Sequence, residues 1–454
     1  MTLHVDYPVA DYEPMAGTAL TDAQRWPLLT EGGAAMLSRL REHPHAPKYN
    51  HACGDRLTAT ARDSLRAYRS RLDAGPRTDW LPELISRVYR TVPRYRGDPT
   101  PASLTDIPLT DRYDLLSRAA THVPDDADLT ELIVYRTSGS RGPAATVPMT
   151  PRFCAQDLPA IEHILARLGV SLASGPTTVA MVNVYAQPVA YQFASVSSYL
   201  DGAGVAKINL HESAWASPTD RASFLDSCAP ELYTGNPISL AELATLPLRT
   251  RPKAILSGAL ALNSGLRTRL ETHFDCPVID LYGITEVGLI AWRADNGPHH
   301  LLPRDLHVEI LSPAGEPSED GTTGEVVVTC GENELLPLLR YRTGDHATRT
   351  GTDLHGLEGR APVRFRAESG HWVQSLELTH VLSPLGLVAW QLTQNETGAI
   401  TLDVHEAGSP APAAAEAAVK SLLGNVPVTV TITNLARDAK PQRYTSTLPG
   451  AELR

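Results

Sequence analysis

From about residue 130 onward, short runs of β-branched residues alternate with segments of helical periodicity. The runs include "TTVAMVNV", "GVAKINL" and "PVIDLYG", and "SGLRTRLETHF" is typical of a crossover helix between two strands. Strands that alternate with helices form a sheet covered by helices, which places the chain in the α/β class. Its 454 residues, 42% of them hydrophobic, are enough to build well-buried cores.

The pattern changes on both sides of this region. Three segments within the first 95 residues repeat apolar side chains every three or four positions, which predicts helices. After residue 306, strands joined by Gly, Asp and Pro turns predict a smaller antiparallel β unit, and after Gly359 strands and helices mix again. We expect a large N-terminal domain of helix-flanked β-sheets with a small β subdomain, residues 1–359, and a small mobile α+β C-terminal domain, residues 360–454.

Charge and cysteine content exclude several classes of function. The net charge of -11 argues against nucleic-acid binding, which needs a surplus of Lys and Arg. No segment resembles a signal peptide or reaches the apolar length of a membrane span, so we expect a cytoplasmic protein without a membrane partner. The five cysteines form no CxxC pair and read as reduced thiols, while a zinc site built from Cys330 and the His299/His300 pair stays an open alternative.

The stretch "VYRTSGSRGPAATVPMT", residues 134–150, contains a candidate anion-binding loop. A strand-like start leads into glycines and hydroxyl side chains, and successive backbone N–H groups in such a loop can surround an anion. The loop matches neither the P-loop pattern nor a nucleophile elbow, so by itself it is equally a polar turn. Its residues are Thr137, Ser138, Gly139, Ser140, Arg141 and Gly142.

Three downstream motifs decide between these readings. "DLYGITEVG" at 280–288, "YRTGD" at 341–345 and "EGR" at 358–360 follow the loop in a fixed order. Together the four segments resemble the signature of adenylate-forming enzymes, the acyl-CoA ligase superfamily. From about residue 80 to 360 the chain is similar to the phenylacetate-CoA ligase family, as in "WLPELISRVYRTVPRYRGDPTPASLTDIPLTDRYDLLSR" and "PKAILSGALALNSGLRTRLETHFDCPVIDLYGITE".

This resemblance implies a site for ATP and Mg²⁺. Activation of a carboxylate by ATP brings two anions together, so the site must hold, neutralise and orient them. The loop 137–142 would hold the β- and γ-phosphates, with Arg141 as its positive charge. Thr285 would bond the α-phosphate, and Glu286 would be a Mg²⁺ ligand, a role that suits a hard oxygen donor.

The same resemblance assigns the nucleoside. Tyr282 would lie against the adenine, Asp345 would accept both ribose hydroxyls, and Arg360 would reach the ribose or a phosphate. Four more residues complete the expected ATP site: Gly258, Ala259, Asp280 and Gly283.

"ARDAKPQRYTS" in the C-terminal domain resembles the family's GKxxR segment. Lys440 and Arg443 keep the spacing, although Ala439 stands where the family has glycine. The resemblance implies that Lys440 bridges the substrate carboxylate and the α-phosphate during adenylation, where a compact ammonium stabilises the developing charge. The alternative is a solvated lysine on a surface loop.

Several positions depart from the family pattern. The phosphate loop has Pro143 to Ala145 where the family has lysine, and the family's "SGE" is "SGA", which removes the carboxylate at Ala259. Ala361 and Pro362 occupy the hinge after Arg360, and proline restricts φ. We therefore expect the domain rotation that separates adenylation from acyl transfer to be altered or to use neighbouring residues.

The segment "VNVYAQPVAYQFASVSSYL" lies where this family forms its acyl pocket. Its aromatic residues, together with Gly258 and Gly283, predict a site for a small aromatic acid rather than a long chain. Equally, these rings can belong to the core. The residues concerned are Tyr185, Tyr191 and Phe193.

These observations predict an ATP- and Mg²⁺-dependent ligase that converts a small, aromatic carboxylic acid to an acyl-AMP and then transfers it to a thiol, CoA or a carrier protein. A homodimer is compatible with this reading. One alternative keeps the fold but has a different second step: an amine acceptor that gives an amide, or the activation of nitrite for N–N bond formation. A second alternative is a nucleotide-binding scaffold that has lost catalysis.

Overall fold

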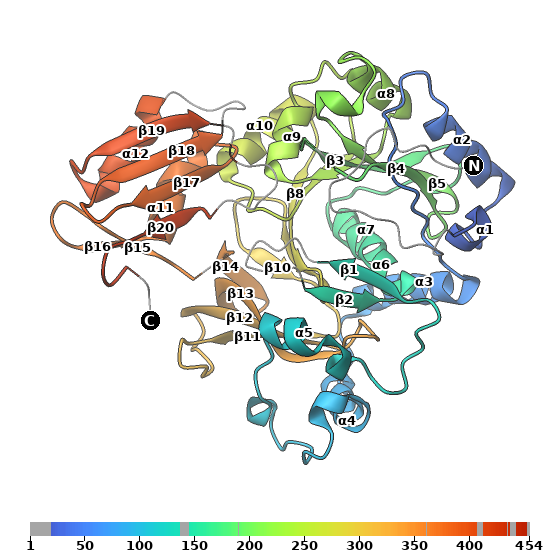
Figure 1. Ribbon diagram of the computed structural model, residues 1–454, viewed down its shortest axis with the longest axis horizontal. Coiled ribbons are helices and arrows are strands. Elements are labelled where there is room, and N and C mark those ends of the chain that lie inside the picture. The colour runs from blue at the N-terminus through green and yellow to red at the C-terminus, as the bar shows by residue number, and fades with distance from the viewer. Residues whose placement is uncertain are drawn as a thin grey trace.

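A computed structural model describes residues 20–136, 145–188, 190–359, 361–405, 412–433, 435 and 442–451. Figure 1 shows a large N-terminal part built around one sheet and a smaller C-terminal part beside it, drawn in orange and red. Within the described residues, we find no helix with the length and apolar character needed to cross a bilayer.

The centre of the N-terminal part is a twelve-stranded sheet in the order β11-β12-β13-β14-β10-β9-β8-β7-β6-β3-β5-β4. Five neighbouring strands run parallel, as the alternation of strands and helices predicts. They are β3 (Val179–Tyr185), β5 (Ala203–Asn209), β6 (Leu232–Gly235), β7 (Ala254–Ser257) and β8 (Val278–Ile284).

The antiparallel strands extend the same sheet. The smaller antiparallel β unit expected after residue 306 is present. β14 pairs with β10 and β10 pairs with β9, so hydrogen bonding is continuous from the parallel strands into this unit. These strands are β4 (Phe193–Ser197) at one edge and, toward the other, β9 (Gly288–Arg293), β10 (His299–Leu301), β14 (Asp353–Glu358), β13 (Leu338–Thr350), β12 (Thr323–Cys330) and β11 (Leu306–Leu311).

The helices begin where the sequence provides capping residues. Thr30, Thr58 and Asn263 each accept a hydrogen bond from the first turn of the helix that follows. The α-helices of the N-terminal part are α1 (Asp22–Arg25), α2 (Glu31–Arg41), α3 (Ala59–Ala74), α4 (Trp80–Thr91), α5 (Arg112–Arg118), α6 (Pro151–Ala155), α7 (Asp157–Arg167), α8 (Asp220–Cys228), α9 (Pro237–Leu243) and α10 (Ser264–Phe274). The four 3₁₀ turns of this part are η1 (Pro93–Tyr95), η2 (Leu104–Asp106), η3 (Ala119–His122) and η4 (Glu212–Ala214).

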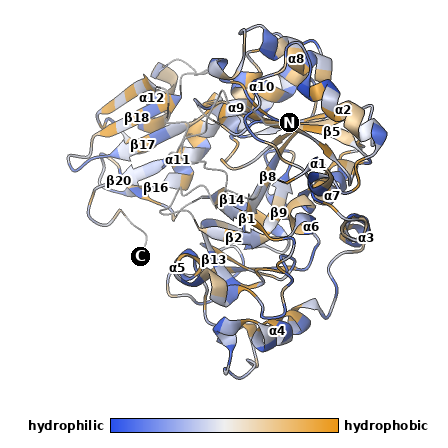
Figure 2. Cartoon of the chain, turned by 45° about the vertical axis from the view of Figure 1, so that its right-hand side comes forward, coloured by the Kyte–Doolittle hydropathy of each residue, from blue (hydrophilic) through white to orange (hydrophobic). Residues whose placement is uncertain are grey.

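Both faces of the parallel strands are covered by apolar cores. One core joins α2, α8, α9 and α10 to the sheet, and the other joins α3 and α7 to its opposite face. Figure 2 shows the apolar colour on the central strands and on the helix sides that face them, with hydrophilic residues on outer turns such as those of α8. The layered α/β architecture is therefore confirmed.

A hairpin packs against the antiparallel half of the sheet. β1 (Ile133–Arg136) pairs with β2 (Thr146–Met149) in antiparallel register, so the candidate phosphate loop connects two paired strands. Val147 and Met149 share one buried core with Tyr282 of the "DLYGITEVG" motif and Tyr341 of the "YRTGD" motif. The packing places β2 beside these two motifs, and β1 lies next to β2 through their pairing.

The C-terminal part has an apolar core of its own and mixes strands with helices. Its four-stranded sheet has the order β19-β18-β17-β20, and β15 pairs with β16. The elements are β15 (Arg364–Arg366), β16 (Trp372–Gln374), α11 (Ser375–Leu382), η5 (Ser383–Leu385), β17 (Trp390–Gln394), β18 (Ile400–His405), α12 (Pro412–Leu423), β19 (Val428–Thr433) and β20 (Tyr444–Ser446).

The C-terminal part contacts the N-terminus of α10. Asn263 Nδ2 donates to the carbonyl of Leu387, and the Ser264 N–H donates to Ser383 Oγ at 3.0 Å. Gly265 lies so close to Gly386 that an added Cβ would stand 2.2 Å from the Gly386 nitrogen. The close approach of the two backbones therefore requires glycine at position 265, while Gly386 adopts φ +70°, a conformation that favours glycine.

Candidate functional site

The "YGITE" motif forms a tight hairpin tip between β8 and β9. Ile284 pairs with Gly288, and the Val287 N–H donates to the Ile284 carbonyl at 3.3 Å, which places Thr285 and Glu286 at the centre of the turn. Gly288 closes the hairpin with φ +76°, a conformation that favours glycine. The two predicted phosphate and metal ligands thus project from a tip fixed by backbone pairing.

The "RTGD" motif forms a β-bulge in β13, at residues 343–345 opposite Val326. Thr343 Oγ1 donates to the Val326 carbonyl at 2.8 Å and accepts the Asp345 N–H at 3.0 Å. Gly344 takes φ +70° at the centre of the bulge. A bulge re-aims the side chain that follows it, and here it turns Asp345 toward β8.

Two hydrogen bonds join these motifs although β8 and β13 are not neighbours in the sheet. The Tyr282 hydroxyl donates to Asp345 Oδ2 at 3.0 Å, and the Tyr341 hydroxyl donates to Glu286 Oε1, also at 3.0 Å. All four residues are buried, Glu286 to 5% exposure and Asp345 to 7%. Burial, reinforced by the charge of Glu286, raises the pKa of Tyr341, so its hydroxyl keeps its proton and donates. One centre therefore holds two carboxylates, each oriented by a tyrosine.

Glu286 suits Mg²⁺ held together with phosphates. Tyr341 occupies one of its carboxylate oxygens, and the other oxygen has no hydrogen-bond partner within the described ranges. We find no group of three His, Cys, Asp or Glu side chains placed to hold a metal among the described residues. Mg²⁺ in nucleotide sites commonly takes one or two carboxylates and completes its shell with phosphate oxygens and water.

Gly258 and Ala259 lie just beyond the carboxyl end of β7, next to the hairpin tip. The Gly258 N–H donates to the Gly235 carbonyl at 2.9 Å, and the space beside its Cα is open apart from the Leu281 carbonyl. Ala259 adopts φ +65°, which is uncommon for a residue with a Cβ. Ligands of open α/β sheets bind outside the carboxyl ends of the strands, where both residues stand. Their contacts with ATP remain predictions.

Gly283 and Asp280 have structural roles that the sequence did not indicate. A Cβ on Gly283 would stand 2.7 Å from the Gly288 carbonyl, so the hairpin requires glycine there. The Asp280 carboxylate is paired with Arg293 at 2.9 Å and His299 at 3.2 Å. Burial raises the pKa of the Asp280 carboxylate, but the hydrogen bond from His299 and the charges of the nearby arginines outweigh this effect, so the pKa is lowered overall. Asp280 therefore braces β8 against β9 and β10, and its predicted contact with ATP stays a prediction.

The zinc alternative finds no support in the described part of the chain. His299 is committed to Asp280, and His300 is bonded to Asp353 at 2.8 Å. Cys330 lies instead beside Arg304, with Nη1 and Sγ 3.7 Å apart. The two histidines hydrogen-bond to different carboxylates, and Cys330 contacts Arg304 rather than either histidine.

Several predicted residues lie outside the described ranges, namely Thr137, Ser138, Gly139, Ser140, Arg141, Gly142, Arg360 and Lys440. Their roles stay predictions. Arg443, the partner of Lys440 in the K-x-x-R spacing, is described: its guanidinium lies 4.2 Å from the Trp390 ring centroid and donates to the Ala261 carbonyl at 3.3 Å. The C-terminal segment is thus held near the loop that follows β7.

The predicted acyl-site aromatics gather around two residues that the sequence reasoning missed. Tyr185, Tyr191 and Phe193 are half-buried and belong to none of the buried apolar clusters among the described residues. Lys207 lies 4.2 Å from the ring centroid of Tyr185, and His51 packs 5.4 Å from that of Tyr191. A lysine inside the apolar strand "GVAKINL" was the sequence clue to this cluster.

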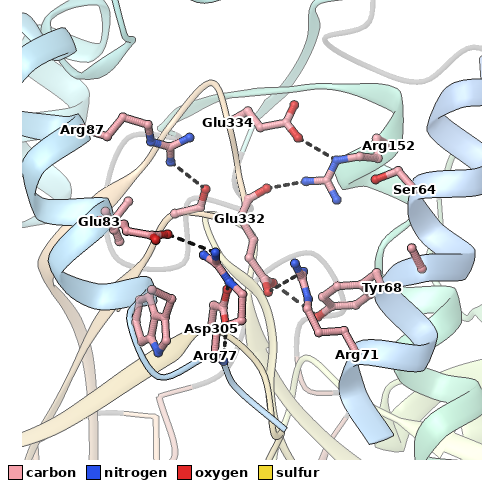
Figure 3. A pocket seen from close by; sticks show the side chains of 14 residues that line it. Ser64, Tyr68, Arg71, Arg77, Glu83, Arg87, Arg152, Asp305, Glu332 and Glu334 are labelled. Atoms are coloured by element: carbon pink, nitrogen blue, oxygen red, sulfur yellow. Dashed lines mark hydrogen bonds and ion pairs between the residues drawn. The ribbon is translucent and has the colours of Figure 1, made fainter. Parts of the chain in front are cut away.

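A separate cavity of about 440 Å³ opens between α3, α4 and the residues after β12, and none of the predicted site residues lines it. Figure 3 shows its arginines facing carboxylates: Arg77 pairs with Glu83 and Asp305, and Arg152 pairs with Glu334. With four arginines and four carboxylates in its wall, the cavity is charge-balanced. It has no surplus positive charge to hold a triphosphate.

Comparisons with known proteins agree with the arrangement of these motifs. The AMP-binding enzyme family matches residues 144–332, which include the hairpin tip. A phenylacetate-coenzyme A ligase of Aromatoleum evansii is 33% identical over 109 residues, 22% of this chain and 24% of that protein. A phenylacetate-coenzyme A ligase of Escherichia coli K12 is 31% identical over 94 residues, 19% of this chain and 21% of that protein.

Residues 144–332 are thus similar to the AMP-binding enzyme family, and about a fifth of the chain is similar to phenylacetate-coenzyme A ligases. The fold of the chain is similar to that of a solved 2-hydroxyisobutyryl-CoA ligase in complex with R3-HIB-AMP, at a TM-score of 0.59 and 18% identity over 86% of this chain and 90% of the other. The aligned sequence spans only about a quarter of the Aromatoleum ligase, 24% of its length. The similarity therefore does not show the activity, the substrate or the acceptor of this protein.

Proposed function

We propose that this protein is an ATP- and Mg²⁺-dependent ligase that activates a small, aromatic carboxylic acid as its acyl-AMP and then transfers the acyl group to a thiol, CoA or a carrier protein. The observation that supports it most is the pair of hydrogen bonds from Tyr282 to Asp345 and from Tyr341 to Glu286. They assemble the two motifs that the superfamily uses for ATP, from positions about 60 residues apart, on strands that are not adjacent.

Each carboxylate of this centre has a task in the proposed reaction. Asp345, oriented by Tyr282, accepts the ribose hydroxyls and fixes the nucleoside. Glu286, oriented by Tyr341, would hold Mg²⁺, and the bound ion would neutralise phosphate charge. Thr285 at the hairpin tip donates to the α-phosphate, and Lys440 brings its ammonium to the developing charge between carboxylate and phosphate.

The attacking carboxylate then forms a bond to the α-phosphorus while the bond to the bridging oxygen of pyrophosphate breaks. Acyl-AMP and pyrophosphate are the products of this first step, and a thiol displaces AMP in the second. The half-buried Tyr185, Tyr191 and Phe193 offer the flat apolar surface that an aryl acid needs. The similarity to phenylacetate-coenzyme A ligases supports the same substrate class.

A panel of acids read by pyrophosphate release tests this proposal. The full-length protein with ATP and Mg²⁺ is given benzoate, phenylacetate, hydroxylated aryl acids, short aliphatic acids and nitrite, each with CoA, with a primary amine, or alone. Mass spectrometry identifies the acyl-AMP and the final product. We expect pyrophosphate release with aryl acids and an acyl-CoA when CoA is present. Failure of every acid to release pyrophosphate, with ATP binding intact, would favour the non-catalytic scaffold.

A non-thiol acceptor is the second candidate, and the docking of the C-terminal part favours it. Val388 and Ala389 belong to the same buried core as the central sheet, and Gly265 packs on Gly386. A domain rotation for thioester formation would have to open this core. Amide formation from an amine, or nitrite activation, needs no CoA, and turnover with an acid and CoA alone would exclude this candidate.

A further inference from the structure

Lys207 is a half-buried cation, and among the described residues it has no carboxylate partner. Its Nζ lies 4.2 Å from the ring centroid of Tyr185 and 5.9 Å from that of Tyr191. None of the ion pairs that join described residues includes it. Aromatic faces attract an ammonium but accept none of its three N–H donors as a carboxylate oxygen would. The hydrogen-bonding capacity of Lys207 is therefore largely unused.

The neighbours of Lys207 are suited to a polar ligand. The sheet register places Asn183 on one side of it and Phe193 on the other. Asn183 Oδ1 is buried and has no hydrogen-bond partner among the described residues. Burial, and then the charge of Lys207, lowers the pKa of His51, so the imidazole is neutral near pH 7 and can donate one hydrogen bond.

The protein holds this cluster in place through its N-terminal segment. The Asn50 side chain donates to the Ala190 carbonyl at 2.9 Å and accepts the Gln192 N–H at 2.9 Å. Gln192 is fully buried and donates to the Lys48 carbonyl at 2.7 Å. These bonds fix His51 against Tyr191, so the positive site is built rather than incidental.

The position of Lys207 in the sheet separates it from the reacting centre. β5 stands three strands away from β7, beyond β6 and β3. At the usual spacing this is roughly 14 Å between the strand axes. The carboxylate to be activated must lie near Gly258 and Thr285, so Lys207 is placed for the opposite end of the acid. Tyr185 on β3 lies on the β7 side of Lys207 and offers a surface for the body of the acid, whereas Phe193 on β4 borders Lys207 on the far side.

We propose that Lys207 is a specificity residue that binds a second acidic group, so that the acid this enzyme activates is an aromatic dicarboxylic acid. This inference rests on the proposed function. The ammonium pairs with the remote carboxylate in a partly desolvated site, where a charged hydrogen bond is stronger than in water. An acid that ends in a neutral amide offers the ammonium a carbonyl acceptor but no opposite charge.

Pyrophosphate exchange with matched acids tests the inference. The wild-type protein receives benzoate, terephthalate and 4-carbamoylbenzoate, and also phenylacetate, 4-carboxyphenylacetate and 4-carbamoylphenylacetate. We expect kcat/KM for the better diacid to exceed that for its amide by on the order of 10- to 100-fold, the usual effect of one charged hydrogen bond. The difference should lie mainly in KM, because Lys207 is remote from the reacting atoms.

Lys207→Met should reduce the ratio of diacid to amide to near one, and Lys207→Arg should keep most of it. Lys253→Met is the matched control, because Lys253 directly precedes β7, three strands away from β5, and is paired with Glu231 at 2.7 Å. Thermal melting confirms that each variant folds. Equal use of diacid and amide by the wild type, or an unchanged ratio in Lys207→Met, would overturn the inference alone. Exchange with none of the acids would overturn the proposed function together with it.

Discussion

The hydrogen bond between Tyr341 and Glu286 provides a direct test of the proposed Mg²⁺ site. The Tyr341→Phe substitution removes only the hydroxyl, which lies 3.0 Å from Glu286 Oε1. Tyr341 is 3% exposed and Glu286 is 5% exposed, so water does not replace the lost donor easily. Tyr341 is a positioning residue in this scheme: it acts on the metal through the carboxylate that it orients.

A hydrogen bond to a charged group contributes about 1.5 to 3 kcal/mol, and each 1.4 kcal/mol corresponds to about tenfold in an equilibrium constant. Removing an outer partner of a metal ligand commonly lowers metal affinity or activity by about 10- to 100-fold. We therefore expect the Mg²⁺ concentration for half-maximal pyrophosphate exchange to rise on that order in Tyr341→Phe. The loss in stability should be smaller than in a core truncation, because the ring and its packing remain.

Tyr68→Phe is the matched control. Tyr68 is also 3% exposed, and its hydroxyl donates to a buried carboxylate, Glu332 Oε2, at 3.3 Å, but it lines the separate cavity. Both variants should lose a comparable amount of stability in thermal unfolding, whereas only Tyr341→Phe should change the Mg²⁺ titration. An unchanged titration in Tyr341→Phe, or the same change in both variants, would refute the role given to Glu286.

Three further outcomes are expected. Lys440→Ala should abolish pyrophosphate exchange while ATP binding measured by calorimetry stays within a few fold, and undiminished exchange would remove its catalytic role. Gly265→Ala should loosen the C-terminal part, since its Cβ would stand 2.2 Å from the Gly386 nitrogen, and limited proteolysis should then cut the segment after residue 359 faster than in the wild type. Burial lowers the pKa of His51 and His299 in the folded chain. Below about pH 6.5 the unfolded chain therefore binds more protons than the folded chain. The free energy of unfolding should then fall on acidification by up to about 1.4 kcal/mol per pH unit for each histidine. Melting temperatures at pH 7.5 and 5.5 measure this, and the decrease should be smaller in His51→Gln; equal melting temperatures would contradict it.

Most of the element types could be predicted from local patterns. The segment "SGLRTRLETHF" coincides with α10, and the strand patterns of the parallel region coincide with β3, β5, β7 and β8. These predictions succeed because apolar periodicity records which side of an element is buried. The antiparallel β unit after residue 306 could be predicted in the same way. Its connection to the parallel strands could not, because the pairing of β14 with β10 links strands through hydrogen bonds that no local pattern specifies.

The site divides in the same way. Tyr282, Glu286 and Asp345 could be proposed from motif order alone, since each motif keeps a residue type that its chemistry requires. The partner of each carboxylate could not, because the bulge at residues 343–345 and the hairpin tip at Thr285 set the side-chain directions across three intervening strands. Asp280 was assigned to ATP from its place in a motif, yet its carboxylate is held by Arg293 and His299.

Residue order and residue type were sufficient for the α/β class, for the adenylate-forming resemblance and for the carboxylates expected to meet ATP and Mg²⁺. The folded sheet was needed to bring Tyr341 to Glu286 and to gather Lys207, Tyr185, Tyr191 and His51 at one place. The physical reason is distance along the chain. A motif reports chemistry within a few residues, whereas the charge around a substrate is set by side chains that only strand register and loop hydrogen bonds make neighbours.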